Sequence, residues 1–261
     1  MGQYFNLQLA TNTLTLDAQQ LDVDPQQLEQ ICIKVHAKLI QHPKPQLWLT
    51  FYIQLPNATL AAQLNWPAWQ QQQVVFTDYL WEQTCLECFI SGPTVKNNHT
   101  SQTAYIEINA SPSGSYALYQ FNDYRKPSCL PPMPLIQANT KEQAYINWAD
   151  DLITPLILST AQLRSYPTLS ADSIARLALM TFVPCYLYKR SFGIPLDQLP
   201  PNLFIKNNRP FNSTDIIMLH PCAVLRFNDT LLYFAPNHAI PPDFHQRQYW
   251  THFDRNKVTH Y

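Results

Sequence analysis

The chain has 261 residues, of which 46% are hydrophobic and 13% charged, and its formal net charge is −1. With 17 basic against 18 acidic residues, there is no cationic excess of the kind that binds nucleic acid or an anionic membrane, so we expect neither as a partner. The 4 glycines and 22 prolines disfavour Gly-rich phosphate loops and suit many short segments joined by rigid turns.

The N-terminal stretch MGQYFNLQLATNTLTLDA lacks the basic start and apolar centre of a signal peptide. No apolar run reaches the roughly 18 residues of a membrane span. The six cysteines are spread along the chain and form no disulfide framework. We therefore expect a soluble cytoplasmic protein with reduced thiols and no membrane contact.

Alternation of apolar and polar residues predicts short strands through the first half of the chain, at 5–16, 30–40, 45–55, 79–91, 103–110 and 115–125. The polar stretch 16–30 predicts a loop or a short helical turn, and 65–73 and 92–101 predict loops. SPSG at 111–114 predicts a tight turn, because proline fixes φ and glycine supplies a positive φ.

The second half is richer in proline. Residues 126–134 cannot form a central strand, 144–160 suits strands or a strand with a short helix, and 189–215 resembles an inserted loop. Residues from Ile174 alternate like a strand, although Ser170 and Asp172 also resemble a helix N-cap. A hairpin around Asn228-Asp229 and a final strand at 248–258 complete the pattern.

These elements predict an all-β chain in which 1–261 form one domain. The expected fold is a single antiparallel β-sandwich of the jelly-roll or immunoglobulin-like type, with a Pro-rich inserted loop and little helix.

Two of the predicted strands carry unexpected polar residues. If 79–91 pairs with 103–110, then Trp81, Glu87, Tyr105, Glu107 and Asn109 share one face, and the Ile and Leu positions face the core. The polar groups then lie on the outer surface of the sandwich, which could be concave.

A face with two carboxylates, an amide, Arg125 and several aromatic rings is suited to a sugar. Aromatic rings stack on the C–H faces of a pyranose, and carboxylates and amides hydrogen-bond its hydroxyls. Two alternatives stay open: a structural ion-pair network on a sheet surface, and an acid–base pair, Glu87 and Glu107, for glycoside hydrolysis.

Other motifs are less specific. CLEC at 85–88 is a CxxC, but in a strand its cysteines point to opposite faces, so we expect ordinary buried thiols. The loop 237–245 holds His238, Asp243 and His245, which suits either a ligand contact or a capped turn, and no metal site is expected.

The stretches LWEQTCLECFI, YIEINASPSGSYALYQFNDYR and PPDFH resemble those of DOMON-like bacterial proteins related to family 9 carbohydrate-binding modules. The resemblance covers about residues 45–126 and 223–255. Leu86 stands where those proteins usually have Phe, and 127–222 is longer, with a Pro-rich insertion at 189–210 that could cover the ligand face. The resemblance implies a small-ligand-binding β-sandwich, with sugar or haem as the ligand, and matching positions at Trp81, Thr84, Cys85, Glu87, Glu107, Asn109, Ser111, Gly114, Tyr119, Arg125, Asp243, Phe244 and His245.

We therefore expect a non-catalytic protein that binds a small molecule, a sugar, and uses no cofactor. The alternatives are a haem-binding domain with His245 or His238 as axial ligand, a glycoside hydrolase, and a protein-interaction module using Trp66 and Trp69. The predicted ligand-binding residues are Trp81, Glu87, Glu107, Asn109, Tyr119, Arg125, Asp243 and His245.

Overall fold

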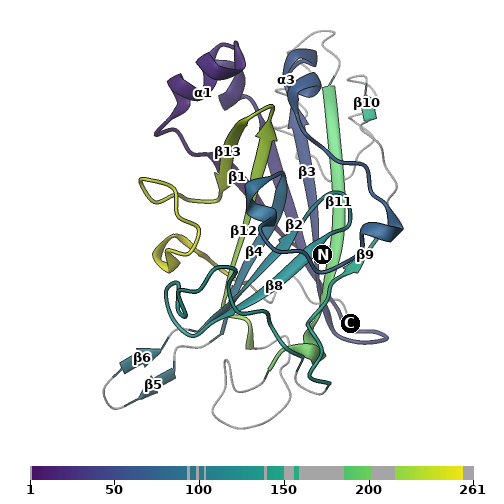
Figure 1. Ribbon diagram of the computed structural model, residues 1–261, viewed down its shortest axis with the longest axis vertical. Coiled ribbons are helices and arrows are strands. Elements are labelled where there is room, and N and C mark those ends of the chain that lie inside the picture. The colour runs from purple at the N-terminus through teal and green to yellow at the C-terminus, as the bar shows by residue number, and fades with distance from the viewer. Residues whose placement is uncertain are drawn as a thin grey trace.

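The computed structural model shows a mostly β, antiparallel chain (Figure 1). The structure describes residues 2–92, 95–97, 100–102, 104–137, 140–149, 156–158, 185–200 and 215–254. Within these residues, the main strands form one continuous sheet that curls into a half-barrel.

One half of the sheet has the strand order β10-β11-β3-β2-β1. Its strands are β1 (Gln3–Leu9), β2 (Cys32–Ile40), β3 (Gln46–Leu55), β10 (Leu156–Leu158) and β11 (Cys185–Pro195), with the short β9 (Asn147–Trp148) paired to β11.

The other half continues from β1 in the order β13-β12-β4-β7-β8. Its strands are β4 (Cys85–Ser91), β7 (Tyr105–Ala110), β8 (Tyr116–Phe121), β12 (Met218–Phe227) and β13 (Thr230–Ala235), with β14 (Thr251–His252) paired to β12. A separate hairpin joins β5 (Val95–Asn97) to β6 (Thr100–Gln102).

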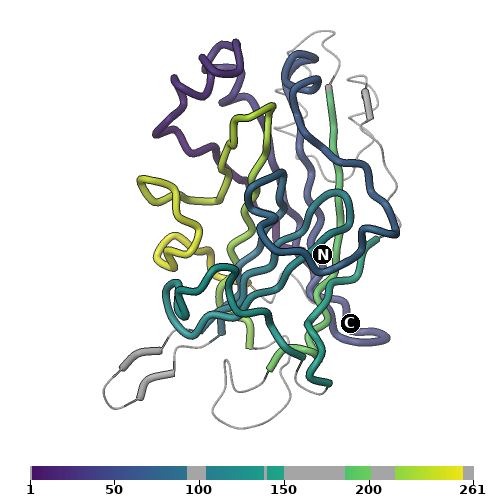
Figure 2. Tube along the Cα trace, in the orientation of Figure 1, coloured from purple at the N-terminus to yellow at the C-terminus, as the bar shows by residue number. Residues whose placement is uncertain are grey.

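The strand β1 belongs to both halves. Residues 3–7 pair with β2, and Gln8 and Leu9 pair with Ala235 and Phe234 of β13. Figure 2 shows these two segments, far apart in sequence, side by side. The N-terminal strand therefore joins the two halves into one sheet.

The main core fills the inside of the curl. Alternate residues of β2 and β3, such as Ile33, Val35 and Phe51, are buried there with Leu86, Ile106 and the other inward residues of the second half. This periodicity was visible in the sequence, and the prediction that the Ile and Leu positions of β4 and β7 face the core is confirmed.

Short helices cover the ends of the sheet: α1 (Leu14–Leu21), α2 (Pro25–Glu29) and α3 (Ala58–Gln63). Asp24 caps α2, with Pro25 at its first position, and Asn57 caps α3 through a side-chain acceptor. The first predicted strand is therefore too long, since the chain leaves the sheet after Leu9 and enters α1. No helix in the described part of the chain is long and apolar enough to cross a membrane.

Two other predictions are wrong. The strand at 79–91 starts only at Cys85, because Tyr79 has a positive φ of 61° and leads into the 3-10 helix η2 (Leu80–Glu82). Residues 189–195 are not an inserted loop: β11 runs beside β3 over its whole length, with Phe192 and Ile194 buried in the core. Pairing with β3 therefore makes this segment a strand despite its polar sequence.

Elsewhere the outcome is mixed. Residues 65–73 lack strands as expected and include the 3-10 helix η1 (Gln71–Gln73), SPSG forms its turn, and the hairpin closes at Asn228-Asp229. Residues 92–101 include strand β5 and the start of β6 rather than a simple loop. The 3-10 helices η3 (Leu196–Gln198) and η6 (Arg247–Tyr249) were not expected, and within the described part of the final strand, 248–254, only Thr251–His252 pairs. The predicted strand from Ile174 and the segment 201–214 lie outside the described residues.

Candidate functional site

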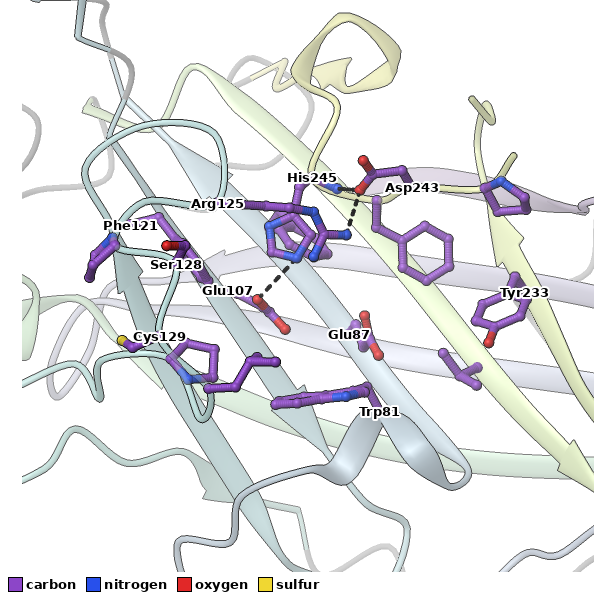
Figure 3. A pocket seen from close by; sticks show the side chains of 17 residues that line it. Trp81, Glu87, Glu107, Phe121, Arg125, Ser128, Cys129, Tyr233, Asp243 and His245 are labelled. Atoms are coloured by element: carbon purple, nitrogen blue, oxygen red, sulfur yellow. Dashed lines mark hydrogen bonds and ion pairs between the residues drawn. The ribbon is translucent and has the colours of Figure 1, made fainter. Parts of the chain in front are cut away.

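A cavity of about 410 Å³ lies on the face of β4, β7 and β8 that points away from the main core (Figure 3). Val224 of β12 and Tyr233 of β13 also line it, and its remaining walls come from η2, from the loop after β8 and from the loop after β13. A second cluster of buried side chains, including Phe89, Tyr105, Phe121 and Trp250, supports this face. Three segments distant in sequence thus meet over one patch of sheet.

The two carboxyl groups Glu87 and Glu107 stand on neighbouring strands in this cavity. In the register of β4 and β7, Glu87 is opposite Asn109 and Glu107 is opposite Phe89. The two glutamates are therefore diagonal neighbours on one face of the pair. Their exposed fractions are only 2% and 4%, so the prediction of the face holds but the expected surface exposure does not.

Hydrogen bonding differs between the two carboxyl groups. Asn109 Nδ2 donates to Glu107 Oε1 at 2.7 Å, and His245 Nε2 lies 3.6 Å from Glu107 Oε2. Glu87 Oε1 is buried and has no hydrogen-bond partner among the described residues. The floor of the cavity therefore contains a carboxyl oxygen, Glu87 Oε1, that is buried without a partner beside the hydrogen-bonded Glu107.

Burial dominates the electrostatics of the pair. Desolvation raises the pKa of Glu107 to about 7, against opposing effects of Asn109 and Arg125. Desolvation and the negative charge of Glu107 raise the pKa of Glu87 well above its usual value, against a hydrogen bond with Cys85. Near neutral pH the pair of glutamates therefore retains a proton, because two close carboxylates in a low dielectric repel each other.

His245 connects the floor to the rim of the cavity. Its Nδ1 lies 2.7 Å from Tyr105 Oη, and the same hydroxyl accepts the backbone N–H of Arg125 at 3.1 Å. Burial, followed by the nearby Arg125 charge, lowers the pKa of His245 to about 3 against the opposing effect of Asp243. His245 is therefore a neutral imidazole at pH 7.

Asp243 ties the two loops of the rim together. It accepts hydrogen bonds from Arg125 Nη2 at 2.8 Å and from the backbone N–H of His245 at 3.1 Å (Figure 3). It also accepts one from the Tyr124 hydroxyl. Burial alone would raise the pKa of Asp243, but the hydrogen bonds of Tyr124 and Arg125 lower it. Arg125 is thus paired with Asp243 at the rim rather than with a glutamate of the floor.

Most of the predicted ligand-binding residues come together in space. The cavity is lined by six of them: Trp81, Glu87, Glu107, Arg125, Asp243 and His245. The other two do not line it. Asn109 is fully buried and holds Glu107, and the fully buried Tyr119 donates its hydroxyl to Asp78 at 2.8 Å.

The sequence interpretation missed the apolar walls of the cavity. Phe89 was on the right face by alternation with Glu87, but it was not singled out. Tyr233 and residues 127–132 come from distant segments, so no local pattern indicated them.

The remaining motifs are structural in the described residues. Cys85 and Cys88 are free and buried on opposite sides of β4, and Trp66 packs on the main core beside Tyr188. His238 lies away from the cavity, with Nε2 2.7 Å from the Gln8 carbonyl. Within the described ranges, no three His, Cys, Asp or Glu side chains are grouped so that they could hold a metal ion.

Fold and site together define a mostly β protein with a cavity that is acidic at its floor and aromatic at its walls. Comparison of the chain with protein-family models, with curated proteins and with solved structures finds no match in any of the three.

Proposed function

We propose that this protein binds a small hydroxyl-rich molecule, a carbohydrate, in the cavity between β4, β7 and the two rim loops, without transforming it. The observation that carries the proposal is Glu87 Oε1, an acceptor buried in the cavity without a partner among the described residues. Leaving such a group unpaired costs about 1–3 kcal/mol. A ligand hydroxyl that donates to it removes this cost.

The walls of the cavity support the same ligand class. Trp81 lines the cavity, and its ring is held by edge contacts with Tyr79 at 5.2 Å and Tyr119 at 5.9 Å. A fixed indole offers a stacking surface for the C–H face of a sugar ring. The cavity volume of about 410 Å³ is towards the small end of ligand sites, which span about 300–1,000 Å³, and favours a compact ligand.

The positions of the two carboxyl groups support binding without catalysis. Glu87 and Glu107 rise side by side from adjacent strands of one floor. A glycosidase needs its carboxyl groups on either side of the scissile bond. The raised pKa values of the pair also suit proton transfer, so turnover has to be measured as well as binding.

The haem alternative has less support. His245 lines the cavity, but its Nδ1 is bonded to Tyr105 and its Nε2 faces Glu107, so an axial bond to iron would require breaking one of these contacts. The carbohydrate proposal includes two further parts. The chain is related to DOMON-like proteins and family 9 carbohydrate-binding modules, and its curled sheet is a form of their β-sandwich.

The test is a titration of the protein with a panel of mono- and disaccharides, followed by calorimetry and tryptophan fluorescence. We expect saturable binding that Trp81→Ala and Glu87→Gln each weaken about tenfold, which corresponds to about 1.4 kcal/mol. Glu82→Gln, an exposed change beside Trp81, serves as the control and should bind like the wild type.

Two results would overturn the proposal. The first is the absence of binding to every saccharide, together with a Soret band from haemin that His245→Ala abolishes. The second is glycoside turnover that disappears in Glu87→Gln and Glu107→Gln.

A further inference from the structure

The charges that line the cavity do not balance. The ionisable side chains along its wall include Glu87, Glu107, Asp243, Arg125 and His245. Arg125 forms its ion pair with Asp243 at 2.8 Å, and His245 is neutral at pH 7 because its pKa is lowered to about 3. Two buried carboxyl groups therefore remain without a cation in direct contact, and Arg125 acts on Glu107 only at longer range.

The surroundings of Glu87 lack a positive group on every element packed against it. The described ionisable groups that act on Glu87, or on which it acts, are Cys85 on β4, Glu107 on β7, Cys222 on β12 and Tyr233 on β13. Each of these is neutral or negative near pH 7. Desolvation makes a carboxylate in such surroundings costly unless a cation arrives from outside.

The walls of the cavity are suited to a cation. Aromatic rings attract a positive charge through their electron-rich faces, and this attraction is strongest where water is excluded. The aromatic side chains of the cavity wall are Trp81, Phe89, Phe121, Tyr233 and Phe244. Figure 3 shows Trp81 and Tyr233 lining the same cavity as the Glu87 carboxyl group.

An ammonium group also matches the available acceptors. It has three N–H donors and no acceptor. Glu87 Oε1 has no partner among the described residues. In Glu107, Asn109 donates to Oε1, and the contact of Oε2 with His245 is long, at 3.6 Å. Charge-assisted hydrogen bonds to such oxygens are about twice as strong as neutral ones.

We infer that the ligand carries an ammonium group, which binds between Glu87 and Glu107 and completes the charge balance of the cavity. This inference rests on the proposed function, and together with it the ligand becomes an amino sugar. Binding of the cation favours the ionised carboxylates, so the proton that the glutamate pair retains near pH 7 passes to the buffer.

Three probes that share a six-membered ring test this inference: D-glucosamine, D-glucose and cyclohexylamine, titrated by calorimetry at pH 7. We expect the affinity for glucosamine to be at least about tenfold higher than the affinity for glucose. The apparent binding enthalpy of glucosamine should differ between two buffers of different ionisation enthalpy, and the sign of the difference should show that binding releases a proton to the buffer. Glu87→Gln should remove both the preference and the proton release, and Glu82→Gln should keep both.

The outcomes separate this inference from the proposed function. If glucose binds as tightly as glucosamine, the inference is wrong and carbohydrate binding stands. If cyclohexylamine binds and no sugar does, the ammonium site stands and the sugar proposal is wrong. If none of the three probes binds, the inference is wrong, and the full saccharide panel decides the proposed function. A preference for glucosamine that survives in Glu87→Gln also contradicts the inference, because the proposed carboxylate contact is then dispensable.

Discussion

The hydroxyl of Tyr105 lies 2.7 Å from Nδ1 of His245, and the contacts around the two groups favour the Nε2–H tautomer of the imidazole. Since the hydroxyl already accepts the backbone N–H of Arg125 at 3.1 Å, its own proton is available to Nδ1. The ring proton of the neutral imidazole then sits on Nε2 and faces Glu107 Oε2 at 3.6 Å. A phenol thereby orients a donor towards the cavity floor.

Tyr105→Phe tests this role. The substitution keeps the buried ring, which stacks on Phe121 at 4.8 Å, but leaves the Arg125 N–H and His245 Nδ1 without their shared partner. We expect the free energy of unfolding to fall by about 1–3 kcal/mol. Nitrogen chemical shifts of His245 should move away from those of a pure Nε2–H tautomer.

The control for this prediction is Tyr4→Phe, whose ring is 47% exposed. Unfolding by denaturant should give the wild-type stability for this variant. Equal stabilities of Tyr105→Phe and wild type would contradict the assigned role.

Glu107→Gln should change how stability depends on pH. The folded state raises the pKa of Glu107 from its usual 4.5 to about 7, so between these values the folded protein binds protons that the unfolded chain releases. The contribution of Glu107 to stability is therefore fully present below pH 4.5 and is lost as pH rises through 7. Relative to wild type, the variant should gain up to about 3 kcal/mol across this window.

The measurement is the difference in unfolding free energy between wild type and Glu107→Gln from pH 4.5 to 8. Taking the difference removes the opposing contributions of the buried histidines. A flat difference for Glu107→Gln would mean that its carboxyl group is not desolvated.

His220→Phe should stabilise the protein in acid. His220 is buried, stacks on Trp250 with a 12° angle between the rings, and its Nδ1 has no partner among the described residues. Burial, followed by the charge on His238, lowers the pKa of His220 from 6.5 to about 3. Its contribution to stability is present above pH 6.5 and is lost as pH falls towards 3.

At pH 4.5 the neutral, buried His220 lowers the free energy of unfolding by about 2–3 kcal/mol relative to pH 7.5, and the phenylalanine variant avoids this decrease. Thermal unfolding at pH 7.5 and 4.5 measures it: the variant should lose less stability than wild type between the two. The same substitution at the exposed His252 should leave the wild-type pH response intact.

Asp243→Asn should loosen the rim of the cavity. Asp243 accepts three hydrogen bonds, from Arg125, Tyr124 and the His245 backbone, and its side chain is 13% exposed. Because Arg125 is 53% exposed, solvent screens part of the ion pair. We expect a loss of about 1–2 kcal/mol at pH 7. Since the folded pKa of Asp243 is lowered, the difference should disappear as pH falls through that value.

Hydrogen exchange of residues 240–246 measures the loosening of the rim directly. The matched control is Asp229→Asn. It breaks the 3.0 Å ion pair between Asp229 and Arg226, in which the Asp229 side chain is 99% exposed. That change should leave both exchange and stability at wild-type values.

Local patterns predicted the faces of the strands but not the closure of the cavity. Alternation places Glu87 and Glu107 on one side of β4 and β7 because the side-chain period of a strand is a local property. The rim depends on contacts between residues such as Arg125 and Asp243, which are distant in sequence, and no periodicity encodes such contacts.

The interpretation of β11 as a loop fails for a related reason. The Pro-rich segment 189–215 resembles an inserted loop in the sequence. Yet Gly193 lies opposite Trp48, where an added Cβ would come within 2.2 Å of the indole ring. The glycine therefore makes room for a large neighbour on β3, which only the paired strand reveals.

The strand β1 also bears on how the chain folds during synthesis. Gln8 pairs with Ala235, so the half-barrel cannot close until the C-terminal hairpin has left the ribosome. Until then β1 presents an unpaired edge beside β2, and such edges promote intermolecular association. Long-range pairing of this kind also slows folding. Yield of the protein in bacteria should therefore rise when translation is slowed by cooling or when chaperones shield the nascent chain.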